Sequence, residues 1–245
     1  MNGPESPPGS ALLLLAHGSR DRRSAVATRM LARAVARARP GVTVRHSFLD
    51  LALPRTGPVL ARLASVGLRE VVVVPLLLTA AYHSRVDVPA VLAAATPPGM
   101  VVRLAGVLGP DPRLVDGLVR RLAPRDGFDA VVLAAAGSSD PDALTTVRGT
   151  AAALGERYGV PCQAGFASAE PGVATVVRRL RESGAHRVAV ASYFLAPGLL
   201  YDRVVASARG AGAVAVATPL VAGGELVRVV SDRFAAACRP VPAAV

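Results

Sequence analysis

Residues 12–21 read LLLLAHGSRD, an apolar run that leads directly into His17 and a turn beginning at Gly18. The pattern returns at residues 131–140, which read VVLAAAGSSD, so that Gly137 stands 119 positions after Gly18. A short apolar run bounded by turn residues is typical of a fully buried strand. The recurrence of the run and its turn predicts an internal duplication of the chain.

Strand-like runs alternate with segments of helical period on both sides of this stretch. The first copy has expected strands at 12–16, 42–48, 71–78 and 100–104, and expected helices at 22–39, 56–66, from 84 or 86 to 95, and 111–122. In the second copy, 130–135 and 187–195 repeat the first and third strands, and Phe166 repeats Phe48. Such alternation indicates parallel sheets covered by helices. We therefore predict an α/β protein of two tandem, doubly wound domains with parallel sheets, at 1–124 and 125–245.

Composition narrows the classes of partner. The chain is 52% hydrophobic and only 4% aromatic, which suits parallel strands buried on both faces. Its net charge is +11 and every basic side chain is arginine, but these arginines are spread along helices without the aromatic residues that stack bases. We expect no nucleic-acid partner, although the charge favours a polyanionic small substrate.

The cysteines and the length of the apolar runs indicate the cellular compartment of the protein. Cys162 and Cys238 have neither metal-ligand spacing nor the density of a disulfide framework. The apolar run at 12–16 is too short for a signal-peptide core or a membrane span. We expect buried, inert thiols, no membrane partner and a cytoplasmic location.

Two of the four histidines follow predicted strands of the first copy. His17 follows the first strand and His83 follows the third, whereas Ala136 and Leu200 stand at these places in the second copy. Ligands of doubly wound sheets gather beyond the carboxyl ends of the strands, where the strand order reverses. Neighbouring strands about 4.8 Å apart can bring two imidazoles to one ion at roughly 2.0–2.1 Å. Two protein ligands leave positions open, which suits a metal ion that must be handed on.

The remaining histidines carry less information. His46 falls inside a predicted strand and His186 has polar or charged neighbours, so both are expected to be structural or solvent-facing.

The ordered motifs together resemble a known family. Residues 16–20 (AHGSR), 48–51 (FLDL), 74–78 (VPLLL) and 83–89 (HSRVDVP) resemble the sirohydrochlorin chelatases of the class II, metal-only type. Residues 135–140 (AAGSSD) and 193–198 (YFLAPG) resemble the long, two-domain members, and the resemblance covers nearly the whole chain. It implies ATP-independent insertion of Co²⁺ or Fe²⁺ into sirohydrochlorin, or a related tetrapyrrole with eight carboxylates, in sirohaem or cobalamin synthesis.

The resemblance also implies roles for the histidines. His17 and His83 match the family's metal-binding histidines, and His17 matches the position with a proton-accepting role. Metal insertion releases two pyrrole protons, and an imidazole with a pKa near about 6.5 can accept a proton at neutral pH. Two imidazoles also accept Ni²⁺ or Zn²⁺, so the physiological metal stays open.

Other residues of the motifs are candidates for substrate contact. Arg20 and Arg85 can pair bidentately with substrate carboxylates, Ser19 belongs to the same turn as Arg20, and Tyr82 can stack on the macrocycle. Asp50 stands where the family commonly has an acidic residue. It either orients a histidine and helps to desolvate the metal, or caps the following turn, and the sequence favours neither role.

Other classes of function fit the sequence less well. A phosphatase with a histidine nucleophile often has arginine before His-Gly, where this chain has Ala16. No P-loop spacing is present, so we expect no nucleotide. A non-catalytic tetrapyrrole or metal carrier fits the same histidines and is the harder alternative. The duplication favours a monomer.

Overall fold

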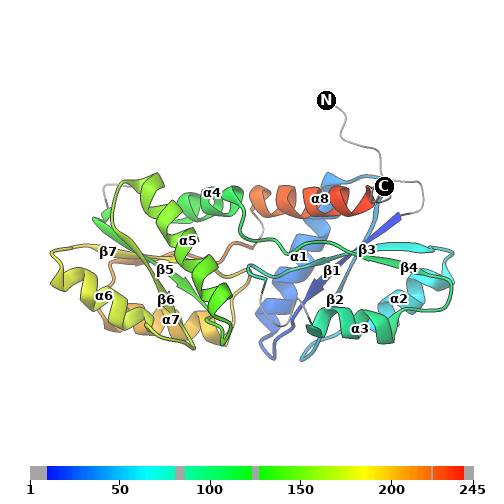
Figure 1. The fold of residues 1–245 in the computed structure, drawn as a ribbon, viewed down its shortest axis with the longest axis horizontal. Helices are drawn as coiled ribbons and strands as arrows, with labels where there is room; N and C mark the ends of the chain where they lie inside the picture. Colours follow the sequence, from blue (N-terminus) through cyan, green and yellow to red (C-terminus); the bar gives the residue numbers. More distant parts are fainter. Residues whose placement is uncertain (1–9, 81–85, 123–126, 222, 240–245) are drawn as a thin grey trace, which may run out of the picture. The chain divides into compact units, whose positions relative to one another are not determined.

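The computed structural model describes residues 10–80, 86–122, 127–221 and 223–239. Strands and helices alternate along the chain, as predicted (Figure 1). In chain order they are β1 (Ser10–Ala16), α1 (Arg22–Ala38), β2 (Thr43–Phe48), α2 (Thr56–Ser65), β3 (Glu70–Pro75), α3 (Val88–Ala95), β4 (Val101–Leu104), α4 (Pro112–Arg121), β5 (Ala130–Ala135), α5 (Pro141–Tyr158), β6 (Cys162–Phe166), α6 (Val173–Glu182), β7 (Val188–Ser192), α7 (Leu199–Gly210), β8 (Ala215–Val216) and α8 (Gly224–Cys238).

The strands form two parallel sheets with the orders β2-β1-β3-β4 and β6-β5-β7-β8. The chain leaves β1 for β2 on one side and then crosses to β3 on the other, so the strand order reverses at β1. The prediction of a duplicated, doubly wound α/β fold is confirmed. β3 ends at Pro75, earlier than predicted. Its neighbour β1 ends at Ala16, so a longer β3 would have no β1 residues beside it to pair with.

Each sheet is buried by helices. Leu13, Leu15 and Val73 point from the first sheet into a core that α2 and α3 cover with Leu60 and Leu92. Side chains alternate across a strand, and Leu12, Leu14 and Val72 on the opposite face are also fully buried. The equivalent core of the second sheet joins β5 and β7 to α6 and α7.

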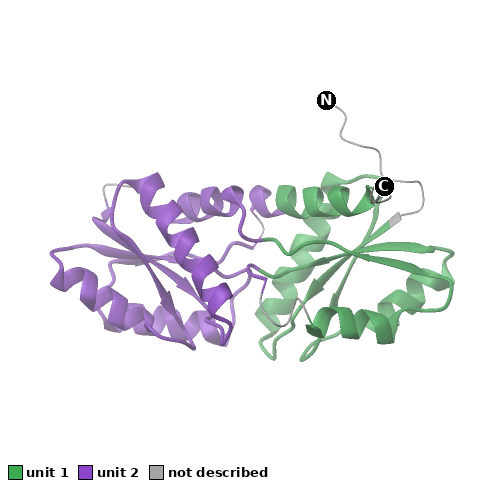
Figure 2. Ribbon diagram, in the orientation of Figure 1, with its two compact units in different colours: residues 1–77, 82–108, 227–245 green, residues 78–81, 109–226 purple. Residues whose placement is uncertain are grey.

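The last helix of each repeat packs with the other repeat (Figure 2). Unit 1 consists of residues 1–77, 82–108 and 227–245, whereas unit 2 consists of residues 78–81 and 109–226. Unit 2 therefore contains α4 of the first repeat, and most of α8 belongs to unit 1. The compact units thus differ from the predicted domains 1–124 and 125–245, which follow the sequence repeats.

Each of these helices is exchanged, in the sense that it packs in the unit of the other repeat. Equivalent arginines on α4 and α8 donate hydrogen bonds that hold the two helices there. In unit 2, Arg121 donates from Nε to the Pro219 carbonyl and from Nη2 to the Leu220 carbonyl, both at 2.9 Å. In unit 1, Arg233 donates in the same way to the carbonyls of residues 107 and 108, at 2.8 and 3.2 Å. Each helix therefore holds the loop after the last strand of the unit in which it packs.

Candidate functional site

The turn after β1 is pressed against the loop after β2. Leu49 and Asp50 donate their backbone N–H groups to the carbonyls of Ala16 and His17, both at 2.9 Å. Gly18 has a φ of +98°, and a Cβ there would overlap the carbonyl oxygen of Asp50. Only glycine meets both demands without strain, so the glycine in the predicted motif fixes this contact.

Ser19 and Asp21 hold the start of α1. The Ser19 Oγ accepts the Asp21 N–H at 3.1 Å, and the Asp21 carboxylate caps the helix by accepting the Arg23 N–H at 2.9 Å. Hydrogen bonds from the side chain and backbone of Arg23 lower the pKa of Asp21. The Ser19 oxygen therefore has a structural task, while Arg20 beside it is exposed.

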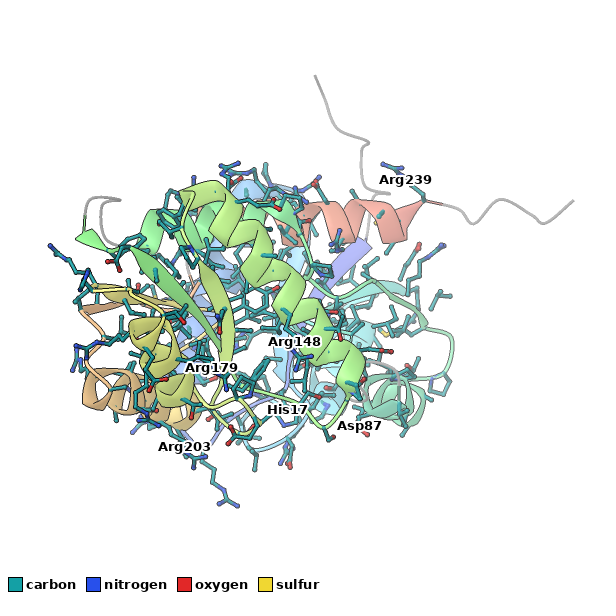
Figure 3. The ribbon with its side chains drawn as sticks, turned by 60° about the vertical axis from the view of Figure 1, so that its left-hand side comes forward. His17, Asp87, Arg148, Arg179, Arg203 and Arg239 are labelled. Carbon is teal, nitrogen blue, oxygen red and sulfur yellow. The ribbon has the colours of Figure 1, made fainter. Side chains whose placement is uncertain are left out.

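His17 and Asp50 lie close to one another at the carboxyl edge of the first sheet. Both are exposed, and Figure 3 shows the His17 side chain at the lower end of the view. The pKa of Asp50 is lowered chiefly by a hydrogen bond from Arg55, then by the Leu51 N–H, with a smaller contribution from the charge of His17. The Arg55 Nη1 donates to Asp50 Oδ1 at 2.6 Å and to the Leu49 carbonyl at 2.9 Å. Arg55 was missed from the sequence, although it stands five residues after the candidate acid.

The loop between β2 and α2 is tightly folded and carries exposed apolar side chains. Ala52 donates its N–H to the Asp50 carbonyl at 2.8 Å, around Leu51 with a φ of 60°. A cis peptide joins Leu53 to Pro54. Leu51 is 42% exposed and Leu53 is 78% exposed. The loop thus presents exposed apolar side chains beside His17 and Asp50.

Three predicted site residues, Tyr82, His83 and Arg85, lie outside the described residues. They belong to the segment that joins β3 to α3. The strand before this segment is a neighbour of the strand before His17, because β3 pairs with β1 in parallel. Among the residues that are described, no group of three or more His, Cys, Asp or Glu side chains is placed to hold a metal ion.

The second repeat has the same backbone turn as this site but lacks the histidine and the acid. Gly137 has a φ of +94°, and Ser168 donates its N–H to the Ala136 carbonyl at 3.0 Å, as Asp50 does to His17. Ser138 accepts the Asp140 N–H at 3.0 Å, as Ser19 accepts that of Asp21. The geometry of the turn therefore does not depend on the side chains of His17 and Asp50.

The other two histidines have the surroundings expected from the sequence. His46 on β2 is partly buried with its ring 5.8 Å from that of Phe48, and burial, followed by the charge of Arg29, lowers its pKa. His186 is exposed, and its backbone N–H donates to Asp129 Oδ2 at 2.8 Å. No helix in the described part of the chain has the length and apolar character to cross a membrane.

The fold and the strand-end turn define a duplicated, doubly wound α/β protein with polar site residues in the first repeat. A family model described as CbiX matches residues 11–125 and 130–237, and the chain therefore belongs to the CbiX family. A search of curated proteins found no matching sequence.

Solved structures share this fold over nearly their whole length. SirB from Bacillus subtilis with Fe³⁺ has a TM-score of 0.79 and 24% identity, covering 92% of this chain and 94% of that one. SirB from Bacillus subtilis subspecies spizizenii with cobalt has a TM-score of 0.75 and 23% identity, covering 91% and 93%. CbiX, described as the terminal enzyme for siroheme biosynthesis in denitrifying bacteria, has a TM-score of 0.69 and 23% identity, covering 93% and 99%.

Proposed function

We propose that this chain is a chelatase that inserts Co²⁺ or Fe²⁺ into sirohydrochlorin or a closely related tetrapyrrole. The observation that carries the proposal is that His17 and Asp50 lie close together at the strand edge of a CbiX-family fold, in the repeat that has both side chains. The related SirB structures contain Fe³⁺ and cobalt, and the related CbiX is an enzyme of siroheme biosynthesis.

His17 has the properties needed to deliver the metal and to accept a proton. Its imidazole is exposed on a turn that two backbone hydrogen bonds join to the loop after β2, so it can bind an incoming ion without first being uncovered. His83, in the segment after the neighbouring strand, supplies the second imidazole of the proposal. Two neutral imidazoles bind borderline divalent metals without enclosing them as a thiolate cage would. Insertion releases two pyrrole protons, and a neutral imidazole accepts a proton readily near pH 7.

The substrate is held by charge and by apolar contact. Arg20 and Arg85 pair with carboxylates of the tetrapyrrole, the Ser19 hydroxyl donates a hydrogen bond, and Tyr82 stacks on the macrocycle. The amino-terminal end of α1 adds favourable potential for an anion. We propose that a single chain performs the reaction and uses no nucleotide.

The test is anaerobic spectrophotometry of the purified chain with sirohydrochlorin and either Co²⁺ or Fe²⁺. We expect catalytic metallation in the wild type, abolished by His17→Ala and by His83→Ala. His186→Ala is the matched control, because this exposed histidine belongs to unit 2, and it should keep wild-type turnover. Tight tetrapyrrole binding without acceleration over the uncatalysed rate would overturn the enzyme and favour a carrier.

A further inference from the structure

Arg55 makes the contacts that fix the candidate acid. One nitrogen, Nη1, donates to Asp50 Oδ1 at 2.6 Å and to the Leu49 carbonyl at 2.9 Å. Leu49 and Asp50 are the two residues whose N–H groups bind the β1–α1 turn. Arg55 therefore ties the carboxylate to the backbone that contacts His17.

The second repeat provides an internal comparison. Phe48 and Phe166 form the same isolated bridge, with Arg55 in the first repeat and with Gly172 in the second. Their N–H groups donate to the carbonyls of Pro54 and Pro171, at 2.9 and 3.0 Å. The same loop backbone therefore forms without an arginine at this position.

The first repeat has both the arginine and the acid, and the second repeat has neither of them at the equivalent positions. Where the first repeat has His17, Asp50 and Arg55, the second has Ala136, Ser168 and Gly172. In the loop of the second repeat, the backbone N–H of Gly172 donates to Glu170 Oε2 at 2.9 Å. The Arg55–Asp50 pair is 44% and 62% exposed, and an exposed ion pair contributes little to stability. The pair is thus best explained by the chemistry of the repeat that keeps His17.

From these contacts we infer that Arg55 is a positioning residue, which holds the Asp50 carboxylate beside His17 for the handling of the metal ion. The inference rests on the proposed function, which places the metal at His17. A residue that orients a group near a metal commonly affects metal affinity or activity by about 10- to 100-fold, without touching the ion itself.

A double-mutant cycle tests whether Arg55 acts through Asp50. Arg55→Gln and Asp50→Asn are made singly and together, and each protein is measured for its Kd for Co²⁺ and for kcat and KM in metallation. We expect each single change to weaken Co²⁺ binding or turnover by about tenfold, and the double variant to be no worse than Asp50→Asn. Arg55→Lys keeps the charge and should restore part of the loss.

The control pair is Arg157 and Asp116 of unit 2, which form an exposed ion pair at the same 2.6 Å. Arg157 lies in the last turn of α5, at the opposite edge of its sheet from the strand carboxyl ends. Arg157→Gln should leave both readouts unchanged. In both arginine variants the unfolding midpoint should shift by less than about 4 °C, so a loss confined to Arg55→Gln is not a folding defect.

The outcomes separate the inference from the function on which it rests. Losses that multiply in the double variant, or no loss in Arg55→Gln, would overturn the positioning role. No loss in Asp50→Asn would also overturn it, because nothing would then be positioned. Failure of the wild type to metallate sirohydrochlorin would count against the chelatase alone, since the cycle in the Kd for Co²⁺ still decides the role of Arg55.

Discussion

Replacing Gly18 with alanine tests whether the two loops of the site are held together by backbone contact. An L-residue at a left-handed φ costs about 1–2 kcal/mol. The new Cβ would also overlap the Asp50 carbonyl oxygen, and so it would break the hydrogen bond from Asp50 to His17, adding about 0.5–1.5 kcal/mol. We expect Gly18→Ala to lower the free energy of unfolding by about 1.5–3.5 kcal/mol.

Gly137→Ala is the matched control, since it has nearly the same φ. Its Cβ would meet the Ser168 Oγ at 3.0 Å and the Ala169 Cβ and N at 3.1 Å, contacts that small shifts can relieve. We expect a cost of about 1–2 kcal/mol, mainly from the backbone conformation.

The assay is thermal unfolding followed by circular dichroism, together with metallation at 25 °C. A difference of about 0.5–1.5 kcal/mol between the two variants corresponds to a gap of roughly 1–6 °C in Tm. Gly18→Ala should also lose turnover, because it moves His17 relative to Asp50, while Gly137→Ala should keep it. Equal Tm values, or full turnover in Gly18→Ala, would refute the close contact between the loops.

Three further predictions follow from other parts of the structure. Hydrogen bonds from the backbone N–H groups of Arg187 and His186 lower the pKa of Asp129, so its stabilising effect is present above a pH of about 4 and is lost as the pH falls. In acid unfolding monitored by fluorescence, wild type should therefore be more stable than Asp129→Asn above that pH, and the two proteins should be equally stable below it. Burial raises the pKa of Cys162 to about 12, so iodoacetamide at pH 8 should modify this thiol only after denaturation, as peptide mass spectrometry would show. Leu53→Ala removes an exposed apolar side chain beside the site, and we expect it to raise the KM for the tetrapyrrole about 3- to 10-fold without changing that for the metal; steady-state kinetics with each substrate varied would contradict this if both values moved together.

Much of the fold could be predicted because its signals are local. The apolar runs at 12–16 and 130–135 form central strands, and Asp111 before Pro112 caps α4 as its sequence indicates, accepting the Arg113 N–H at 3.1 Å. These features depend on a few adjacent residues. The exchange of α4 and α8 depends instead on which sheet each helix meets, and an apolar helix face does not specify its partner.

The site could be predicted in part for the same reason. His17 and Gly18 form a contiguous motif, whereas the sequence favours neither of the two roles considered for Asp50. The structure pairs Asp50 with Arg55 and places it close to His17, a relation that depends on the fold of the intervening loop. The replacement of Arg55 by Gly172 in the second repeat was the available signal, because it accompanies the loss of the histidine and the acid.

The exchanged helices make each repeat incomplete by itself. A chain cut between the repeats would leave residues 1–124 with α4, which packs on the second sheet, and without α8, which completes the first. Such a fragment could obtain a helix in the place of α8 from another molecule, as in a domain-swapped dimer. The covalent join supplies that helix at a fixed, high effective concentration, so folding does not depend on meeting a partner. The second half has Ala136 and Leu200 at the positions of His17 and His83, yet its last helix completes the fold of the half that has the histidines.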